Sequence, residues 1–202
     1  MSEIGLIDWF AMLAGIIGVY LSVKEKTLAW LLFILCYTSY VYISFREGYY
    51  AFGGMNVVFV AIAGYGWYKW TKPENKHSGS EIQISHMPAK QRGLVALCIG
   101  IGTLGIGWLL ASTGEARLPY YDAFATSCAF AAQWMLSRKH IENWIFWILS
   151  DVIYLVFFFN DRIWPSVVLF VVFIILAIKG WIEWKAKITA LAAQNPSSQS
   201  ST

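Results

Sequence analysis

The sequence has few charged side chains for its length. Only 13% of its 202 residues are Asp, Glu, Lys or Arg, whereas 58% are hydrophobic and 17% are aromatic. A soluble domain usually has about 25% charged residues, so the composition argues strongly against a soluble enzyme and excludes a disordered chain. The formal net charge of +3 is too small to indicate a nucleic-acid partner.

The three cysteines show no paired spacing and lie in apolar runs. We therefore expect neither a disulfide framework nor a metal site. The apolar segments contain no nucleophile–base pair, which predicts that the protein is not an enzyme. The glycines of residues 100–105 match a dinucleotide-binding pattern, but that pattern requires a soluble strand–helix unit, so we expect no cofactor.

Long apolar segments, in contrast, are abundant. They have about the length at which a helix crosses the ~30 Å hydrocarbon core of a bilayer. Asp151 and Lys179 are the charged residues within them. The sequence therefore predicts an all-α membrane protein with seven transmembrane helices. The segments are residues 9–23, 27–45, 48–68, 93–114, 123–137, 143–160 and 163–182.

The basic residues predict the orientation of these helices. Twelve of the fifteen Lys and Arg residues would lie on one side of the membrane, the exceptions being Arg46, Arg117 and Arg162. Loops rich in Lys and Arg stay in the cytoplasm, so the N-terminus is predicted outside and the C-terminus inside. Residues 71–92 are then a cytoplasmic loop, and residues 190–202 are predicted to be a disordered cytoplasmic tail.

Two parts of the chain match each other at an offset of 114 residues. Residues 8–70 align without a gap onto residues 122–184, with three tryptophans and two Asp/Tyr pairs in register. We therefore predict three-helix repeats at residues 1–70 and 115–189, joined by a connector helix at residues 93–114. One connector between two triplets gives both triplets the same orientation. Such parallel repeats are typical of transporters, whose substrates bind near the membrane midplane between the repeats.

Asp151 is the only acidic residue well inside a predicted span. Trp144, Trp147 and Tyr154 lie three to seven residues away, at intervals that place all four side chains on one helix face. A charge at the bilayer centre costs at least ~2.5 kcal/mol on insertion scales and normally faces an interior cavity. Asp151 is thus either a binding carboxylate or a protonated or hydrogen-bonded residue that packs helices together.

The repeat offset predicts a matching aromatic face on the second helix, which includes Trp30, Tyr37 and Tyr40. Aromatic faces stack on flat rings and attract cations, with a contribution of ~0.5–2 kcal/mol for each cation contact. Two such faces around one carboxylate predict a site for a flat aromatic cation. An aromatic stripe at helical spacing is also typical of simple packing.

Three amide side chains extend this candidate site: Asn143 beside the aromatic face, Gln133 in the fifth helix and Asn56 in the third. An amide both donates and accepts hydrogen bonds, which suits a carboxamide or sugar hydroxyls. For Gln133 and Asn56, a hydrogen bond between helices is the alternative. Asp8 and Asp122 lie at outer helix ends, where we expect them to act as helix caps.

The run QWMLSRKHIENWIFW at residues 133–147, together with Asp151 and Tyr154, resembles the Pnu family of bacterial vitamin transporters. The resemblance extends over all seven predicted helices. It implies a 3+1+3 helix fold similar to that of SWEET sugar transporters, homotrimers in the inner membrane, and facilitated diffusion without a coupling ion. It also implies that Trp144 and Trp147 bind the vitamin, which a separate cytoplasmic kinase then traps by phosphorylation.

The family resemblance leaves the substrate open among related vitamins. Nicotinamide riboside has a permanently cationic ring, a carboxamide and a ribose, which would suit Asp151, the two indoles and Gln133. Thiamine is also a flat permanent cation, and other family members carry riboflavin, so nicotinamide riboside is the first choice and thiamine the alternative. An alternative of another class is a heptahelical receptor or photoreceptor, in which Lys179 would hold retinal.

Overall fold

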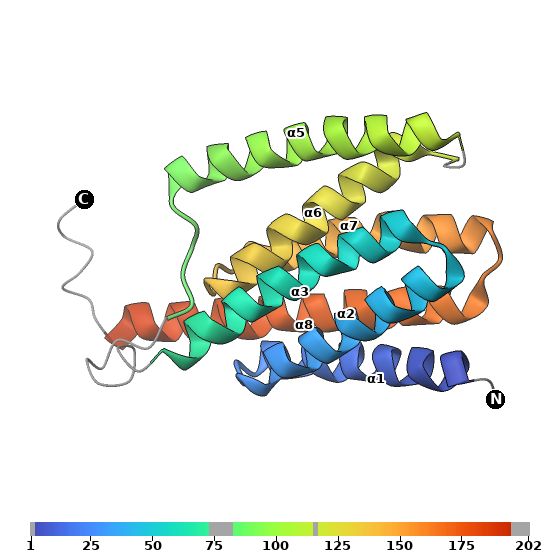
Figure 1. The fold of residues 1–202 in the computed structure, drawn as a ribbon. Helices are drawn as coiled ribbons and strands as arrows, with labels where there is room; N and C mark the ends of the chain where they lie inside the picture. Colours follow the sequence, from blue (N-terminus) through green and yellow to red (C-terminus); the bar gives the residue numbers. More distant parts are fainter. Residues whose placement is uncertain (1–2, 73–82, 115–116, 195–202) are drawn as a thin grey trace.

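The computed structural model describes residues 3–72, 83–114 and 117–194, and over these residues the chain forms seven α-helices (Figure 1). No strand is present in the described segments, so the predicted all-α fold is confirmed. The helices are α1 (Glu3–Val23), α2 (Leu28–Glu47), α3 (Tyr50–Thr71), α5 (Ala89–Thr113), α6 (Pro119–Ser137), α7 (Asn143–Asn160) and α8 (Trp164–Gln194).

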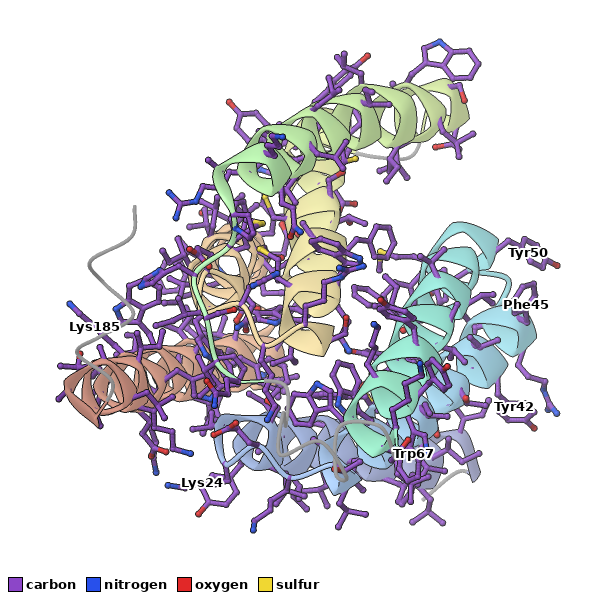
Figure 2. All side chains as sticks on the ribbon, turned by 90° about the vertical axis from the view of Figure 1, so that its left-hand side faces the viewer. Lys24, Tyr42, Phe45, Tyr50, Trp67 and Lys185 are labelled. Carbon is purple, nitrogen blue, oxygen red and sulfur yellow. The ribbon has the colours of Figure 1, made fainter. Side chains whose placement is uncertain are left out.

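Six of these helices form a closed ring. Each packs against its neighbour in the order α1, α2, α3, α6, α7 and α8, and α8 packs back against α1. Helix α5 lies outside the ring, along α6 (Figures 1 and 2). The ring has one end at which α1, α3, α6 and α8 finish, and we call it the basic end because most Lys and Arg residues lie there. Figure 2 is a view onto this end, with Lys24 and Lys185 labelled.

Five of the described helices, α1, α2, α5, α7 and α8, are long and apolar enough to cross a membrane. The chain is thus a multi-pass membrane protein. Helix α6 does not meet the same measure because it is more polar, and eleven of its 19 residues are buried against other helices. An interior helix needs less apolar surface than one that faces lipid. For α3 and α6, crossing of the membrane stays a prediction.

Several helices are longer than the sequence predicts, among them α1, α5, α6 and α8. Helix α5 begins at Ala89 rather than residue 93, which shortens the predicted loop. Helix α8 continues to Gln194, so residues 190–194 are helical and were wrongly placed in a disordered tail. With 31 residues it spans about 46 Å, which exceeds the ~30 Å core and extends α8 beyond the membrane at the basic end. Residues 73–82 of the loop and 195–202 of the tail lie outside the described residues.

The same tryptophan contacts occur in both halves of the ring, 114 residues apart. Trp30 meets Trp70 edge-on at 5.4 Å between ring centroids, and Trp144 meets Trp184 in the same way at 5.2 Å. In each pair, the second tryptophan also donates its indole N–H to a backbone oxygen of the other half. Trp70 donates to Ser137 at 3.1 Å, and Trp184 donates to Val23 at 3.0 Å. These contacts agree with the predicted repeat, whose boundaries stay a prediction.

Two equivalent glycines allow this packing. A Cβ on Gly66 would overlap the indole of Trp30, and a Cβ on Gly180 would overlap the indole of Trp144. The rings of α2 and α7 therefore lie directly against the backbones of α3 and α8. Both indoles are almost fully buried as a result.

We expect Gly66→Ala to destabilise the protein, because the added methyl group would displace the Trp30 ring. Overpacking of this kind costs about 1–3 kcal/mol. The matched control is Gly64→Ala on the same helix, where a Cβ meets nothing within 4 Å. Alanine favours a helix over glycine by about 1 kcal/mol, so the control should keep or raise the melting temperature in detergent. Equal melting temperatures for the two variants would contradict the packing described here.

Candidate functional site

The carboxyl group of Asp151 lies at the centre of the ring. Asp151 is the ninth residue of α7, halfway along it, and is only 5% exposed. Its carboxyl is close enough to interact electrostatically with the hydroxyls of Tyr37 and Tyr154. Since Tyr37 belongs to α2, on the opposite side of the ring from α7, the carboxyl points inward. Among the described residues, no donor forms a hydrogen bond with it.

The predicted aromatic faces of α2 and α7 come together in part. Trp30, Tyr37, Trp144 and Trp147 all belong to one hydrophobic cluster. Trp30 and Trp144 are fully buried in this cluster, whereas Tyr37 and Trp147 keep part of their surface exposed.

Tyr40 and Tyr154 lie about one turn further along α2 and α7, towards the end of the ring opposite the basic end. The hydroxyl of Tyr154 donates to Asp122 at 2.9 Å and also pairs with Thr126 at 2.9 Å. Tyr40 interacts with Asp8 at the equivalent positions. The predicted capping role of Asp122 is therefore wrong: α6 begins at Pro119, and Asp122 instead fixes the tyrosine of the neighbouring helix.

Several candidate residues carry buried polar atoms without a hydrogen-bond partner. In the described segments, both amide atoms of Gln133, the Asn143 Oδ1 atom and the indole nitrogens of Trp30 and Trp144 are in this state. Leaving such a group unpaired costs about 1–3 kcal/mol, so folded proteins seldom do it without a reason. Gln133 is the strongest case, because its whole side chain is buried and neither atom is paired. A buried amide with both atoms unpaired suits a polar ligand.

The other amides are partly or fully paired within their own segments. The Asn143 Nδ2 atom donates to the His140 carbonyl at 2.7 Å, which leaves only its oxygen unpaired. The Asn56 Nδ2 atom donates to the Phe52 carbonyl at 2.9 Å, one turn earlier in α3. This bond is internal to the helix, and a binding role for Asn56 stays a prediction.

A row of aromatic rings, two of which the sequence analysis missed, connects the two halves. Tyr37 stacks on Phe33 at 6.0 Å and on Phe59 at 4.9 Å, and Phe59 contacts Phe130 at 4.7 Å. The row thus passes from α2 through α3 to α6. Phe130 lies three residues before Gln133, and this spacing on one helix face could have identified it.

A surface groove between α1 and α2 is separate from this site. It is open and mainly apolar, and none of the candidate residues lines it. Tyr42, on the edge of the groove, is 41% exposed and points away from the ring (Figure 2). The groove residues are Leu6, Ile7, Phe10, Leu35, Thr38, Ser39 and Tyr42.

Comparison with known proteins identifies the family. Residues 5–186 match the family model described as nicotinamide mononucleotide transporter. This chain belongs to that family. The family is one of transporters, and the resemblance to Pnu proteins noted in the sequence is confirmed.

Two curated transporters are similar to this chain. The chain is 22% identical over 206 residues to the nicotinamide riboside transporter PnuC of Escherichia coli, covering 90% of this chain and 86% of the relative. It is 24% identical over 132 residues to the riboflavin/roseoflavin transporter RibM of Streptomyces davaonensis, covering 65% and 62% of the two chains. A crystal structure of the vitamin B3 transporter PnuC matches with a TM-score of 0.71 at 20% identity, covering 92% of this chain and 83% of that one. The family fold is therefore shared.

Gln133→Leu should separate binding from stability. Leucine removes two unpaired polar atoms, which cost about 1–3 kcal/mol each when buried, so the melting temperature without ligand should rise. Binding of a polar ligand at the candidate site should weaken at least tenfold, as measured by calorimetry. The control is Ser127→Ala, because the buried Ser127 hydroxyl is also unpaired but lies beside Gly102 of α5. If Gln133→Leu binds ligand as tightly as the parent, Gln133 is not part of the site.

Proposed function

We propose that this protein carries nicotinamide riboside across the bacterial inner membrane by facilitated diffusion. The observation that carries the proposal is the inward-facing, unpaired carboxyl of Asp151 beside the aromatic cluster. A buried carboxylate without a partner attracts a permanent cation. Family membership and the similarity to the nicotinamide riboside transporter of E. coli support nicotinamide riboside as that cation.

Each part of nicotinamide riboside has a matching group. The pyridinium ring would stack on Trp147, with Trp144 behind it, and its charge would lie near Asp151. The carboxamide or ribose would take up the unpaired amide atoms of Gln133 and the Asn143 oxygen. Tyr37 would contribute a second ring from the opposite helix. Thiamine shares the flat cation but lacks the carboxamide, which makes it the alternative substrate.

The transport mechanism would be alternating access by the two three-helix units around this central site. The predicted orientation, with the N-terminus outside and the basic end in the cytoplasm, agrees with the usual distribution of Lys and Arg. We further propose homotrimers in the lipid bilayer and trapping of the vitamin by a separate cytoplasmic kinase, in the service of NAD biosynthesis. The trimer, the kinase and the link to NAD biosynthesis rest on the family resemblance.

The photoreceptor alternative is less well supported. A lysine that binds retinal must point into the interior of the helix bundle. The ammonium of Lys179 instead lies over the ring of Tyr20 at 5.3 Å, in the seam between α8 and α1, and its side chain is exposed.

Purified protein in lipid vesicles should release preloaded radiolabelled nicotinamide riboside without a proton or sodium gradient, since diffusion through a uniporter follows only the substrate gradient. Release should be saturable, and an excess of unlabelled vitamin outside should accelerate it by exchange. Protein-free vesicles are the control. A strict requirement for an ion gradient would exclude facilitated diffusion.

Asp151→Asn should weaken binding of nicotinamide riboside at least tenfold, which corresponds to about 1.4 kcal/mol. The asparagine side chain is neutral and therefore lacks the charge that attracts the pyridinium ring. The reduced form of the vitamin is uncharged and makes a matched probe. The substitution should change its affinity much less. Calorimetry with both forms tests the charge argument, and equal losses for the two forms would contradict it.

Trp147→Ala should abolish binding of nicotinamide riboside while leaving the melting temperature within a few degrees of the parent, because the indole is only partly buried. Trp144→Ala should lower both the affinity for nicotinamide riboside and the melting temperature, since Trp144 is 1% exposed and packs on Gly180 and Trp184. Removal of a buried Trp costs about 3–5 kcal/mol. A Trp147→Ala variant with parental affinity would remove this ring from the site.

A further inference from the structure

An ion pair joins the two halves at the centre of the basic end. The carboxylate of Glu25, in the turn between α1 and α2, accepts hydrogen bonds from Lys139 at 2.7 Å and from Lys187. Lys139 lies in the equivalent turn between α6 and α7, and Lys187 lies on the projecting part of α8. The Glu25 and Lys139 side chains are only 19% and 11% exposed.

The geometry of both turns holds this pair in place. Glu25 and Lys139 each have a φ of +55°, a conformation that side chains other than glycine seldom adopt. The Lys139 ammonium also lies 4.9 Å from the centre of the Trp70 ring, which attracts cations. Burial by itself raises the pKa of Glu25, but the hydrogen bonds from Lys139 and Lys187 outweigh it and leave the pKa below its ordinary value. The carboxylate is therefore ionised at neutral pH.

Polar contacts also close the two seams beside this pair. In the seam between α1 and α8, Lys24 bonds Glu183 at 2.8 Å. In the seam between α3 and α6, the Arg138 guanidinium donates to the Tyr65 hydroxyl at 3.2 Å and lies 4.6 Å from the centre of the Trp134 ring.

The opposite end of the ring lacks a comparable set of contacts in the described residues. There, the polar contact between the halves is the long hydrogen bond from Thr126 to the Met55 sulfur at 3.5 Å. The strong pairs at that end stay within one half, as in the bond from Tyr154 to Asp122. Polar contacts between the halves are therefore concentrated at the basic end.

We propose that the Glu25–Lys139 pair, together with Lys187, is the gate of the basic end: it holds the two halves together and must separate each time the central site opens to that side. This assignment rests on the proposed transport function. Because Glu25 and Lys139 keep part of their surface exposed and Lys187 is 51% exposed, water can replace these bonds, so a gate of this kind can open and close. A purely structural pair would stay closed throughout transport.

Cross-linking tests the gate directly. The variant Glu25→Cys/Lys139→Cys is made in a background with the three native cysteines replaced by alanine, and a short bis-methanethiosulfonate reagent joins the two positions. Uptake of nicotinamide riboside into vesicles should fall at least tenfold and recover on reduction, whereas single-cysteine variants treated in the same way keep their rate. Unchanged uptake by the cross-linked protein would overturn the proposal. Absence of uptake in the uncross-linked parent would instead contradict the proposed function.

A second measurement does not depend on the transported molecule. Ala177 is 2% exposed and packs in the cluster below the gate, so Ala177→Cys in the same background reports opening by its reaction with a water-soluble thiol reagent. Glu25→Gln should increase that reaction rate at least tenfold. Glu47→Gln removes the same charge from an exposed position at the other end of α2 and should leave the rate unchanged. Equal rates in both variants would overturn the gate.

Discussion

A carboxyl group enclosed by six helices is the constraint on which the rest of the structure depends. Among the described residues no donor forms a hydrogen bond with Asp151, and such a group is expensive to keep in an apolar medium. The helices must therefore surround it completely, away from lipid, and a positive ligand is the natural way to balance it. The ring of helices and the inward aromatic rings are both consistent with this placement.

The pattern of apolar segments was enough to predict the helices and their order, because bilayer thickness fixes the length of a spanning helix. It was not enough to find the C-terminal end of α8. The residues around Lys187 lie beyond the apolar segment, and a helix that leaves the membrane can continue through such polar residues in water. The spacing of Trp144, Trp147 and Asp151 correctly placed these residues on one face. The spacing also placed Tyr154 there, and its hydroxyl donates a hydrogen bond to Asp122 of the neighbouring helix.

Contacts between distant segments account for what the sequence could not provide. Phe59 joins the aromatic row only because α3 packs between α2 and α6. Likewise, the meeting of Glu25 and Lys139 depends on two turns that are 114 residues apart. Helical periodicity describes one helix at a time, so it gives no information about which side chain of the next helix lies opposite. An offset alignment reveals equivalent positions, but it does not show whether they touch.

The meeting of Glu25 and Lys139 also shows what a single chain with two similar halves can achieve. In a symmetric pair of identical subunits, any residue on the two-fold axis faces its own copy, so an acidic side chain there would face another acid. Once both halves belong to one polypeptide, the two positions can differ, and here they carry opposite charges. The oppositely charged pair stabilises contact between the first half and the second half. Two copies of the same half would instead bring like charges together.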